Sequence, residues 1–325
     1  MKTVSDIGER ELINLAKQIY QEHDESIDLS DDCATIPIND EYVLASTDMI
    51  SVKTHIPKGM SSWQIGWFIT AINLSDIAAK GGHPIGILLS LGLPKTFPKS
   101  SFLDLIKGAS SCATHFNTSI IGGDTKENDQ LVLSGTALGK IKKEYFLSRK
   151  GAVPGDIIAV TGRVGKAAAG LYELQNNIKH GAINELCEPF PRVNEGIFFA
   201  ETKKVHCCMD LSDGISASLY QLADLNNVGF QIEEDQLPVS NRLIELARTD
   251  TSLDLTHLSL HFGGDYELLI ITSEENFQYL KEEIKKYDVE LTKVGSVIEE
   301  KKIYIQTAKN TRIILPNLGY EHLKN

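Results

Sequence analysis

Short apolar runs alternate with longer segments of helical periodicity along this chain, and this alternation limits the folds that it can adopt. The first half has predicted strands at 41–50, 85–93, 118–121 and 130–141, and predicted helices at 6–23, 61–82 and 98–115. The second half has predicted strands at 157–161, 205–210, 228–233, 267–272, 290–297 and 302–306, and predicted helices at 165–176, 192–203, 213–226, 239–249 and 274–287. Such mixtures bury the apolar face of a sheet beneath helices. The sequence therefore predicts a mixed α/β (α+β) fold of layered sheets and helices.

A polar loop separates the two halves. It reads KKEYFLSRKGAVPGD and combines lysine, arginine, glycine and proline between two apolar strands. A chain of 325 residues is also longer than one small hydrophobic core usually supports. We therefore predict an N-terminal domain over residues 1–145 and a C-terminal domain over residues 146–325.

Charge and hydropathy exclude several classes of protein. The formal net charge of -12 disfavours a nucleic-acid partner, because a duplex-binding surface is basic. No apolar run approaches the roughly 20 residues of a transmembrane helix, and the N-terminus lacks the apolar core of a signal peptide. We therefore expect a cytoplasmic protein without membrane contacts, whose five scattered cysteines are reduced, mostly buried thiols.

Carboxylates recur at the ends of the apolar segments. They are Asp31, Asp32, Asp48, Asp76, Asp124, Asp210, Asp213, Asp265 and Glu267. Each one alone is also what a turn or a helix cap would show, and Asp213, which precedes a glycine and a helix, is predicted to be such a cap. Asp76 is different, because it lies in the last turns of a helix that a Ser61/Gln64 capping box should open. The macrodipole disfavours an anion there.

Convergence of these carboxylates would require a cation. Two carboxylates about 5 Å apart repel each other by roughly 3 kcal/mol at an effective dielectric constant of about 20. Aspartate, asparagine and hydroxyl oxygens without histidine or cysteine suit a hard ion such as Mg²⁺. An acidic protein also needs metal ions as intermediaries if it binds a polyphosphate. The pattern therefore predicts a magnesium-dependent nucleotide site.

Two glycine-containing stretches resemble phosphate-binding loops. In IIGGDT, residues 120–125, a strand is predicted to end in a glycine turn that presents Asp124. In VTGRVGKAAAG, residues 160–170, the spacing is two residues short of a P-loop, and Ala167 replaces the hydroxyl that would bind Mg²⁺. We interpret the second stretch as a structural junction between a strand and a helix, although its amides could still face an anion.

Two basic side chains are candidates for the same site. His55 follows Asp48 by seven residues, and either a structural role or a place in the cleft is compatible with that spacing. Arg149 lies in the loop between the halves, either as a solvated charge or as a clamp on phosphate. No spacing typical of a covalent Ser-His-Asp or Cys-His system stands out.

Seven motifs in order resemble those of thiamine-monophosphate kinases. They are SDDCA, STDMISVKTHI, AINLSDIAAKGGHPIG, IIGGDT, SRKGAVPGD, DLSDGIS and GGDYELL. The resemblance, which runs nearly end to end, implies an N-terminal ATP- and Mg²⁺-binding domain whose sheet forms a homodimer interface, and a C-terminal α/β domain. It further implies transfer of the ATP γ-phosphate to thiamine monophosphate with several Mg²⁺ ions. The acceptor is a phosphate that is largely ionised near neutral pH, so we predict no essential general base.

The resemblance also assigns roles to individual residues. The implied Mg²⁺ ligands are Asp32, Ser46, Thr47, Asp48, Asp76, Asp124 and Asp210, with Asp213 at a further ion. The implied ATP contacts are Gly123, Asp124, Arg149 and Ser212. The implied thiamine contacts are His55 and Tyr320. Gly264 occupies the position of a glutamate that contacts the substrate in the family, and we expect Asp265 to take over that contact.

The sequence is also compatible with two other interpretations. Aminoimidazole ribonucleotide synthetase and the hydrogenase-maturation dehydratase of the same superfamily share parts of the pattern, but the dehydratase uses a C-terminal cysteine and this chain ends GYEHLKN. The other alternative is a non-catalytic nucleotide-binding paralogue, against which the retained aspartates count.

Overall fold

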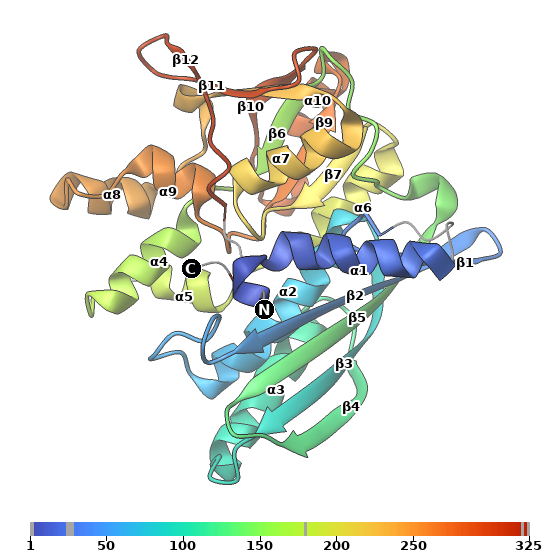
Figure 1. Cartoon of the computed structure of the whole chain (residues 1–325), viewed down its shortest axis with the longest axis vertical. Helices are drawn as coiled ribbons and strands as arrows, with labels where there is room; N and C mark the ends of the chain where they lie inside the picture. The colour runs from blue at the N-terminus through green and yellow to red at the C-terminus, as the bar shows by residue number, and fades with distance from the viewer. Residues whose placement is uncertain (1–2, 24–28, 179–180, 320–321, 324–325) are drawn as a thin grey trace.

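The computed structural model describes residues 3–23, 29–178, 181–319 and 322–323. Within them the chain forms two sheets with helices packed on each, one above the other in Figure 1. This arrangement confirms the predicted mixed fold of two layered units. The predicted boundary near residue 145 falls between the last strand of the first sheet and the first strand of the second. No helix among the described residues is both long and apolar enough to cross a membrane.

The first sheet has the strand order β1-β2-β5-β3-β4. Its strands are β1 (Ala34–Ile38), β2 (Glu41–Ser51), β3 (His83–Leu93), β4 (Ile120–Glu127) and β5 (Val132–Lys142). The helices α2 (Ser62–Ala79) and α3 (Lys99–His115) pack against each other, and α2 covers one face of this sheet. The helix α1 (Glu9–His23) lies across the junction of the two sheets (Figure 1).

The second sheet has the order β12-β11-β8-β10-β6-β9-β7. Its strands are β6 (Ile157–Thr161), β7 (Cys207–Asp210), β8 (Gly229–Glu233), β9 (Leu268–Thr272), β10 (Leu291–Ile298), β11 (Ile303–Gln306) and β12 (Arg312–Ile314). The helices of this half are α4 (Lys166–Gln175), α5 (Ala182–Cys187), α6 (Val193–Thr202), α7 (Ile215–Asn226), α8 (Asn241–Thr249), α9 (Leu255–His261) and α10 (Glu274–Glu283). Short 3₁₀ turns lie at Val4–Asp6, Lys143–Tyr145, Glu234–Gln236 and Ile284–Tyr287.

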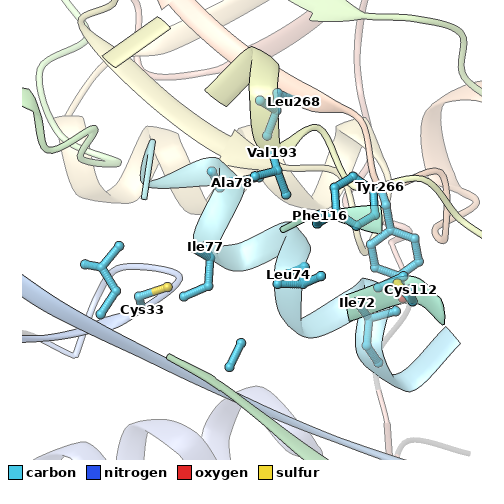
Figure 2. Packing of buried hydrophobic residues seen from close by; sticks show 14 of the residues in the cluster. Cys33, Ile72, Leu74, Ile77, Ala78, Cys112, Phe116, Val193, Tyr266 and Leu268 are labelled. Carbon is cyan, nitrogen blue, oxygen red and sulfur yellow. The ribbon is translucent and has the colours of Figure 1, made fainter. Parts of the chain in front are cut away.

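The helix α2 holds the two halves together. Its first turn has the predicted capping box, in which the Gln64 amide donates to Ser61 Oγ at 3.2 Å and the Ser61 amide donates to Gln64 Oε1 at 3.0 Å. Most of its residues are buried, as expected for a helix that is apolar on every side. Figure 2 shows Ala78 beside Val193 and Leu268 of the second half. One continuous core therefore runs through α2 and fixes the side chains of both halves relative to each other.

Several short elements were not predicted from the sequence. They are β1, β12, α5 and α9, and each is too short for its periodicity to be distinguished from that of a loop. All five cysteines lie in described residues, where they are buried and form no disulfide bond, as predicted.

The glycine turn predicted after residue 121 is wrong. Strand β4 continues through Gly122 and Gly123 to Glu127 and pairs in parallel with β3. Gly123 has a φ of +153°, and a Cβ added to it would lie 1.8 Å from the carbonyl oxygen of Leu89. The glycine is therefore required by a close approach of two strands, which local sequence cannot reveal.

Candidate active site

Three carboxylates meet where the two halves join. Oxygen atoms of Asp32, Asp76 and Asp210 all lie within 4.8 Å of one another. Asp32 comes from the loop before β1, Asp76 from the last turns of α2, and Asp210 from the end of β7. The predicted convergence is therefore real for these three residues, and the buried helix α2 is what brings the first sheet's carboxylates to the second sheet.

Asp32 is held as an anion by two basic side chains. Its Oδ2 lies 2.6 Å from Lys80 Nζ, and its Oδ1 accepts from Arg149 Nε at 2.9 Å. Burial alone would raise the pKa of Asp32, but the positive charges of Arg149 and Lys80 outweigh burial and hold that pKa below its usual value. Arg149 also donates to Gln221 Oε1 at 2.9 Å, so its guanidinium is fixed in place.

The other carboxylates of the cluster have raised pKa values. Burial, together with the nearby carboxylates Asp48 and Asp210, raises the pKa of Asp76 well above its usual value. Burial and the charge of Asp32 raise the pKa of Asp210 to about 7, although Ser75 Oγ donates to it at 2.7 Å. Carboxylates that resist ionisation in this way are stabilised as anions by a bound cation.

Asp48 and Ser46 extend the cluster along β2. Ser46 donates a hydrogen bond to Asp76. The amide of Asp48 donates to Asn73 Oδ1 at 3.1 Å, which fixes this part of β2 against α2. Burial and the neighbouring Asp213 raise the pKa of Asp48 to about 6.

A cavity of about 560 Å³ opens over the cluster. Its polar wall contains Asp31, Asp32, Ser46, Thr47, Asp48, Asp76, Arg149, Asp210 and Ser212. The rest of the lining is mostly apolar; α1 contributes Ile13, Ala16, Lys17 and Tyr20, and Leu29 and Ala45 complete it. A pocket that combines carboxylates with apolar and basic side chains can hold metal-bound phosphates joined to an organic group.

Asp124 does not join this cluster within the chain. The sheet register aligns Met49, Ser134, Ser90 and Asp124 in one row across β2, β5, β3 and β4. Asp124 is therefore about 14 Å from β2, at roughly 4.8 Å per strand. Residues in one row share a face, and Asp48, next to Met49, points to the opposite face. Our expectation that all these carboxylates converge is thus not met by a single chain.

The surroundings of Asp124 form a second, smaller hollow on the uncovered face of the first sheet. Its volume is about 200 Å³, and it is lined by Ser90, Leu91, Gly92, Asp124, Lys126, Val132 and Ser134. The Asp124 side chain is 61% exposed and lies 3.6 Å from Lys126 Nζ. Thr47 shares this face of the sheet, and its hydroxyl donates to the carbonyl of Gly135 at 2.8 Å.

Asp213 is not the helix cap that the sequence indicates. The N-cap of α7 is Gly214, and no side chain caps the helix there. Burial and the charge of Glu9 raise the pKa of Asp213. The Asp213 carboxylate therefore adds to the negative charge at the edge of the cluster instead of capping the helix.

Two of the predicted thiamine contacts, His55 and Asp265, are not part of the cavity lining. His55 Nδ1 is 2.7 Å from Thr54 Oγ1, and its ring lies 5.1 Å from that of His322. The Asp265 carboxylate accepts the amides of Gly165 and Ala167 at 2.6 and 3.0 Å, so it occupies the turn that resembles a P-loop. The anion at that turn is therefore supplied by the protein itself. Tyr320 lies outside the described residues.

Sequence reasoning missed the α1 residues that line the cavity, and it also missed Lys80 and Tyr266. Lys80 ends α2 and contacts Asp32, and its only sequence signal is a lysine four residues after Asp76 in an otherwise apolar stretch. Tyr266 has a left-handed backbone with a φ of 49° and is buried. Burial, with Asp48 and Asp210 nearby, raises the pKa of its phenol well above the usual value. Its ring also packs edge-on against Phe68 at 6.0 Å.

Comparison with known proteins identifies the family. The N-terminal domain of AIR synthase related proteins matches residues 30–141, and the C-terminal domain of the same proteins matches residues 153–308. A thiamine-monophosphate kinase of Methanospirillum hungatei is 35% identical over 90% of this chain and 93% of its own length. The chain belongs to the thiamine-monophosphate kinase family. A second member, from Pyrococcus horikoshii, is 30% identical over 99% of this chain and 98% of its own.

Solved structures agree with this membership. A thiamine-monophosphate kinase from Stenotrophomonas maltophilia is 29% identical and superposes with a TM-score of 0.77, covering 90% of this chain and 95% of its own. A chain described as AaThiL complexed with AMPPCP and TMP has a TM-score of 0.88 at 24% identity, covering 99% of both chains. The hydrogenase maturation protein HypE of E. coli has a TM-score of 0.74 at 18% identity over 94% of this chain and 97% of its own, which shows a shared fold.

Proposed function

We propose that this protein is a thiamine-monophosphate kinase that makes thiamine diphosphate from thiamine monophosphate and ATP. The observation that carries the proposal is the convergence of Asp32, Asp76 and Asp210 at a cavity, in a chain that belongs to this family. In the reaction an oxygen of the thiamine monophosphate phosphate forms a bond to the γ-phosphorus. The bond from that phosphorus to the β-phosphate oxygen breaks, and ADP leaves with the electron pair.

The cluster fits Mg²⁺ as the metal. Its donors are carboxylate oxygens from three elements, close enough to share ions, and the Ser46 hydroxyl bonds to Asp76. Thr47 also lines the cavity, although its own hydroxyl bonds to the Gly135 carbonyl on the other face of the sheet. We assign Asp32, Ser46, Thr47, Asp48, Asp76 and Asp210 as ligands, with Asp213 near a further ion. Bound Mg²⁺ would neutralise charge on the phosphates as the phosphoryl group transfers.

The protein groups around the cluster position the nucleotide. Arg149 lines the cavity with its guanidinium held between Asp32 and Gln221, and Ser212 lies beside it at the cavity wall. A guanidinium fixed in this way can orient a phosphate without losing the conformational freedom that a mobile side chain would lose. We therefore assign Arg149 and Ser212 to ATP. We assign no general base, since the acceptor oxygen is ionised.

We further propose a homodimer through the uncovered face of the first sheet. This face exposes apolar side chains, among them Met49 at 66% and Ile121 at 53% exposure, and such patches are typical of interfaces. Asp124 and Gly123 lie on β4, the strand at the edge of the first sheet. A second copy on this face gives Asp124, which cannot reach the cluster of its own chain, access to the nucleotide of the neighbouring copy.

The thiamine end is assigned to His55 and Tyr320. His55 is at the end of the β2 turn and packs against the C-terminal segment at His322, the part of the chain that also contains Tyr320. Asp265 stays a predicted contact, although both of its oxygens already accept amides, one from Gly165 before α4 and one from Ala167 in its first turn.

The deciding experiment is product formation from thiamine monophosphate and ATP, with and without Mg²⁺, resolved by chromatography. We expect thiamine diphosphate and ADP in equal amounts and only when Mg²⁺ is present. ADP without thiamine diphosphate would show that the acceptor is a different molecule. Neither product from folded, metal-loaded protein would overturn the kinase assignment in favour of a non-catalytic nucleotide-binding paralogue.

A further inference from the structure

Lys80 is among the largest side chains that are completely buried in this protein. It is the C-cap residue of α2, four residues after Asp76, and its side chain has 0% exposure. Lysine is almost never fully buried unless its charge is paired. Its partners therefore show what the side chain does.

The ammonium group has three partners. Nζ donates hydrogen bonds to the carboxylate of Asp31 and to the carbonyl of Cys208 at 2.9 Å, and it forms an ion pair with Asp32 Oδ2 at 2.6 Å. A buried ammonium group held by two hydrogen bonds and an ion pair is fixed in position.

These acceptors belong to the elements that build the carboxylate cluster. Asp31 and Asp32 are adjacent in the loop before β1, and Cys208 is two residues before Asp210 on β7. Lys80 itself is one helical turn beyond Asp76. A single ammonium group therefore joins the three segments that carry Asp32, Asp76 and Asp210.

Lys80 also changes the balance of charge. Asp31, Asp32, Asp48, Asp76 and Asp210 line the cavity, and the fixed cations that contact Asp32 are Lys80 and Arg149. Without Lys80, Asp31 would lose the ammonium group and Asp32 would keep only the guanidinium of Arg149. Repulsion between Asp32 and Asp210 would then push the loop away from β7 unless another cation entered.

We propose that Lys80 is a positioning residue, a built-in cation that keeps the carboxylate cluster assembled before any metal ion binds. It holds one side of Asp32, leaves the cluster open toward the cavity, and supplies charge that Mg²⁺ would otherwise have to supply. This inference rests on the proposed function only in taking Mg²⁺ as the ion that the cluster binds.

The test is the thermal stability of Lys80→Met, which keeps the length of the side chain and removes its charge. Breaking a buried ion pair by removing one partner is strongly destabilising, so we expect the metal-free melting temperature to fall by at least about 5 °C. Because Mg²⁺ replaces the missing charge, the rise in melting temperature on adding Mg²⁺ should be larger in the variant than in the parent protein.

A double variant separates charge from packing. In Lys80→Met with Asp31→Asn, one anion is removed together with the cation, and the asparagine still accepts hydrogen bonds. We expect the metal-free melting temperature to recover by at least half. Two outcomes would overturn the proposal and leave Lys80 as a packing residue only. One is a fall in the melting temperature of Lys80→Met that is equal with and without Mg²⁺, and the other is a double variant whose melting temperature does not recover.

Two further variants complete the test. Lys285→Met removes an exposed lysine that pairs with Glu282 at 2.6 Å, and its melting temperatures should match those of the parent. If Lys80→Met is insoluble, the single variant Asp31→Asn tests the proposal. The rise in its melting temperature on adding Mg²⁺ should be smaller than in the parent protein, and an equal or larger rise contradicts the proposal. Product formation is measured separately, so its absence would count against the kinase assignment and not against Lys80.

Discussion

At the scale of single residues, the site depends on carboxylates that the fold brings together at a cost. Burial and the neighbouring anions Asp48 and Asp210 raise the pKa of Asp76, so the metal-free protein stores repulsion that a cation relieves. The Asp76 carboxylate therefore lowers the stability of the metal-free protein and is needed for function, a conflict that is common in active sites. Its effect on stability and its effect on turnover can be measured independently.

The variant Asp76→Asn should separate these effects. It removes an anion of the cluster and keeps the shape of the side chain, so we expect the turnover of thiamine monophosphate to fall at least about 100-fold. The metal-free melting temperature should stay the same or rise, because repulsion is removed. Kinetics at saturating Mg²⁺ and thermal unfolding in a chelator provide the two measurements.

The control for this variant is Asp104→Asn, an exposed aspartate that pairs with Lys107 at 3.2 Å. Its turnover should equal that of the parent. Retained turnover in Asp76→Asn would remove Asp76 from the proposed set of metal ligands.

The pH dependence of stability follows from the raised pKa values. Burial raises the pKa of Asp48 to about 6 and that of Asp210 to about 7, both above the usual value near 4. The folded protein therefore binds protons more tightly than the unfolded chain. This contribution to stability is fully present below pH 4 and is lost as the pH rises through 6 to 7.

We therefore expect the melting temperature of metal-free protein, followed by thermal unfolding in a chelator, to fall between pH 5 and pH 8. Saturating Mg²⁺ should reduce or reverse this trend, because the ion prefers the deprotonated carboxylates. Asp210→Asn should flatten the metal-free curve. A metal-free melting temperature that rises over the same interval would contradict the assignment of these two carboxylates.

At the scale of elements, sequence reasoning succeeded where the signal is local. The helix α2 was predicted from its length and its Ser61/Gln64 capping box, both of which lie within the segment itself. The glycines of IIGGDT were misread because the contact that requires Gly123 comes from β3, more than thirty residues earlier. Lys80 was missed for the same reason, since nothing near it in the sequence shows that Asp31, Asp32 and Cys208 surround it.

The close approach of β3 and β4 gives a prediction at this scale. In Gly123→Ala the added methyl group would lie 1.8 Å from the Leu89 carbonyl, in a backbone conformation that favours glycine. The strands must separate, and we expect a loss of roughly 2–3 kcal/mol of stability. Thermal unfolding would show this loss as a lower melting temperature.

Gly181→Ala is the matched control for that substitution. A Cβ at Gly181 meets no atom of the described residues within 4 Å, and the backbone there has an ordinary φ of -66°. Its melting temperature should be unchanged or slightly raised. If Gly123→Ala is as stable as this control, the close approach of β3 and β4 does not require the glycine.

At the scale of the whole molecule, no element within the described residues covers one face of the first sheet. The helix α2 packs on one face, and the other exposes Met49, Leu88 and Ile121. A sheet normally buries at least one face, and an apolar second face is typical of association. The same face carries Asp124, so oligomeric state and activity are expected to change together.

Leu88→Glu should disrupt the proposed dimer. Leu88 is at the middle of β3, the strand next to the edge strand β4, and is 36% exposed. A carboxylate therefore fits there in the single chain but would face its counterpart or an apolar surface in a symmetric pair. We expect a dimer for the parent protein and a monomer for the variant, measured by size-exclusion chromatography with light scattering. Turnover should fall at least about tenfold because Asp124 would no longer reach a neighbouring site.

Ile314→Glu provides the control, since Ile314 is also apolar and 59% exposed but lies on β12 at the edge of the other sheet. It should remain dimeric and active. If the parent protein is monomeric at micromolar concentration and fully active, the proposed dimer is refuted. Asp124 would then have no part in the active site. A monomeric Leu88→Glu variant with full turnover would retain the dimer but remove Asp124 of the second copy from the reaction.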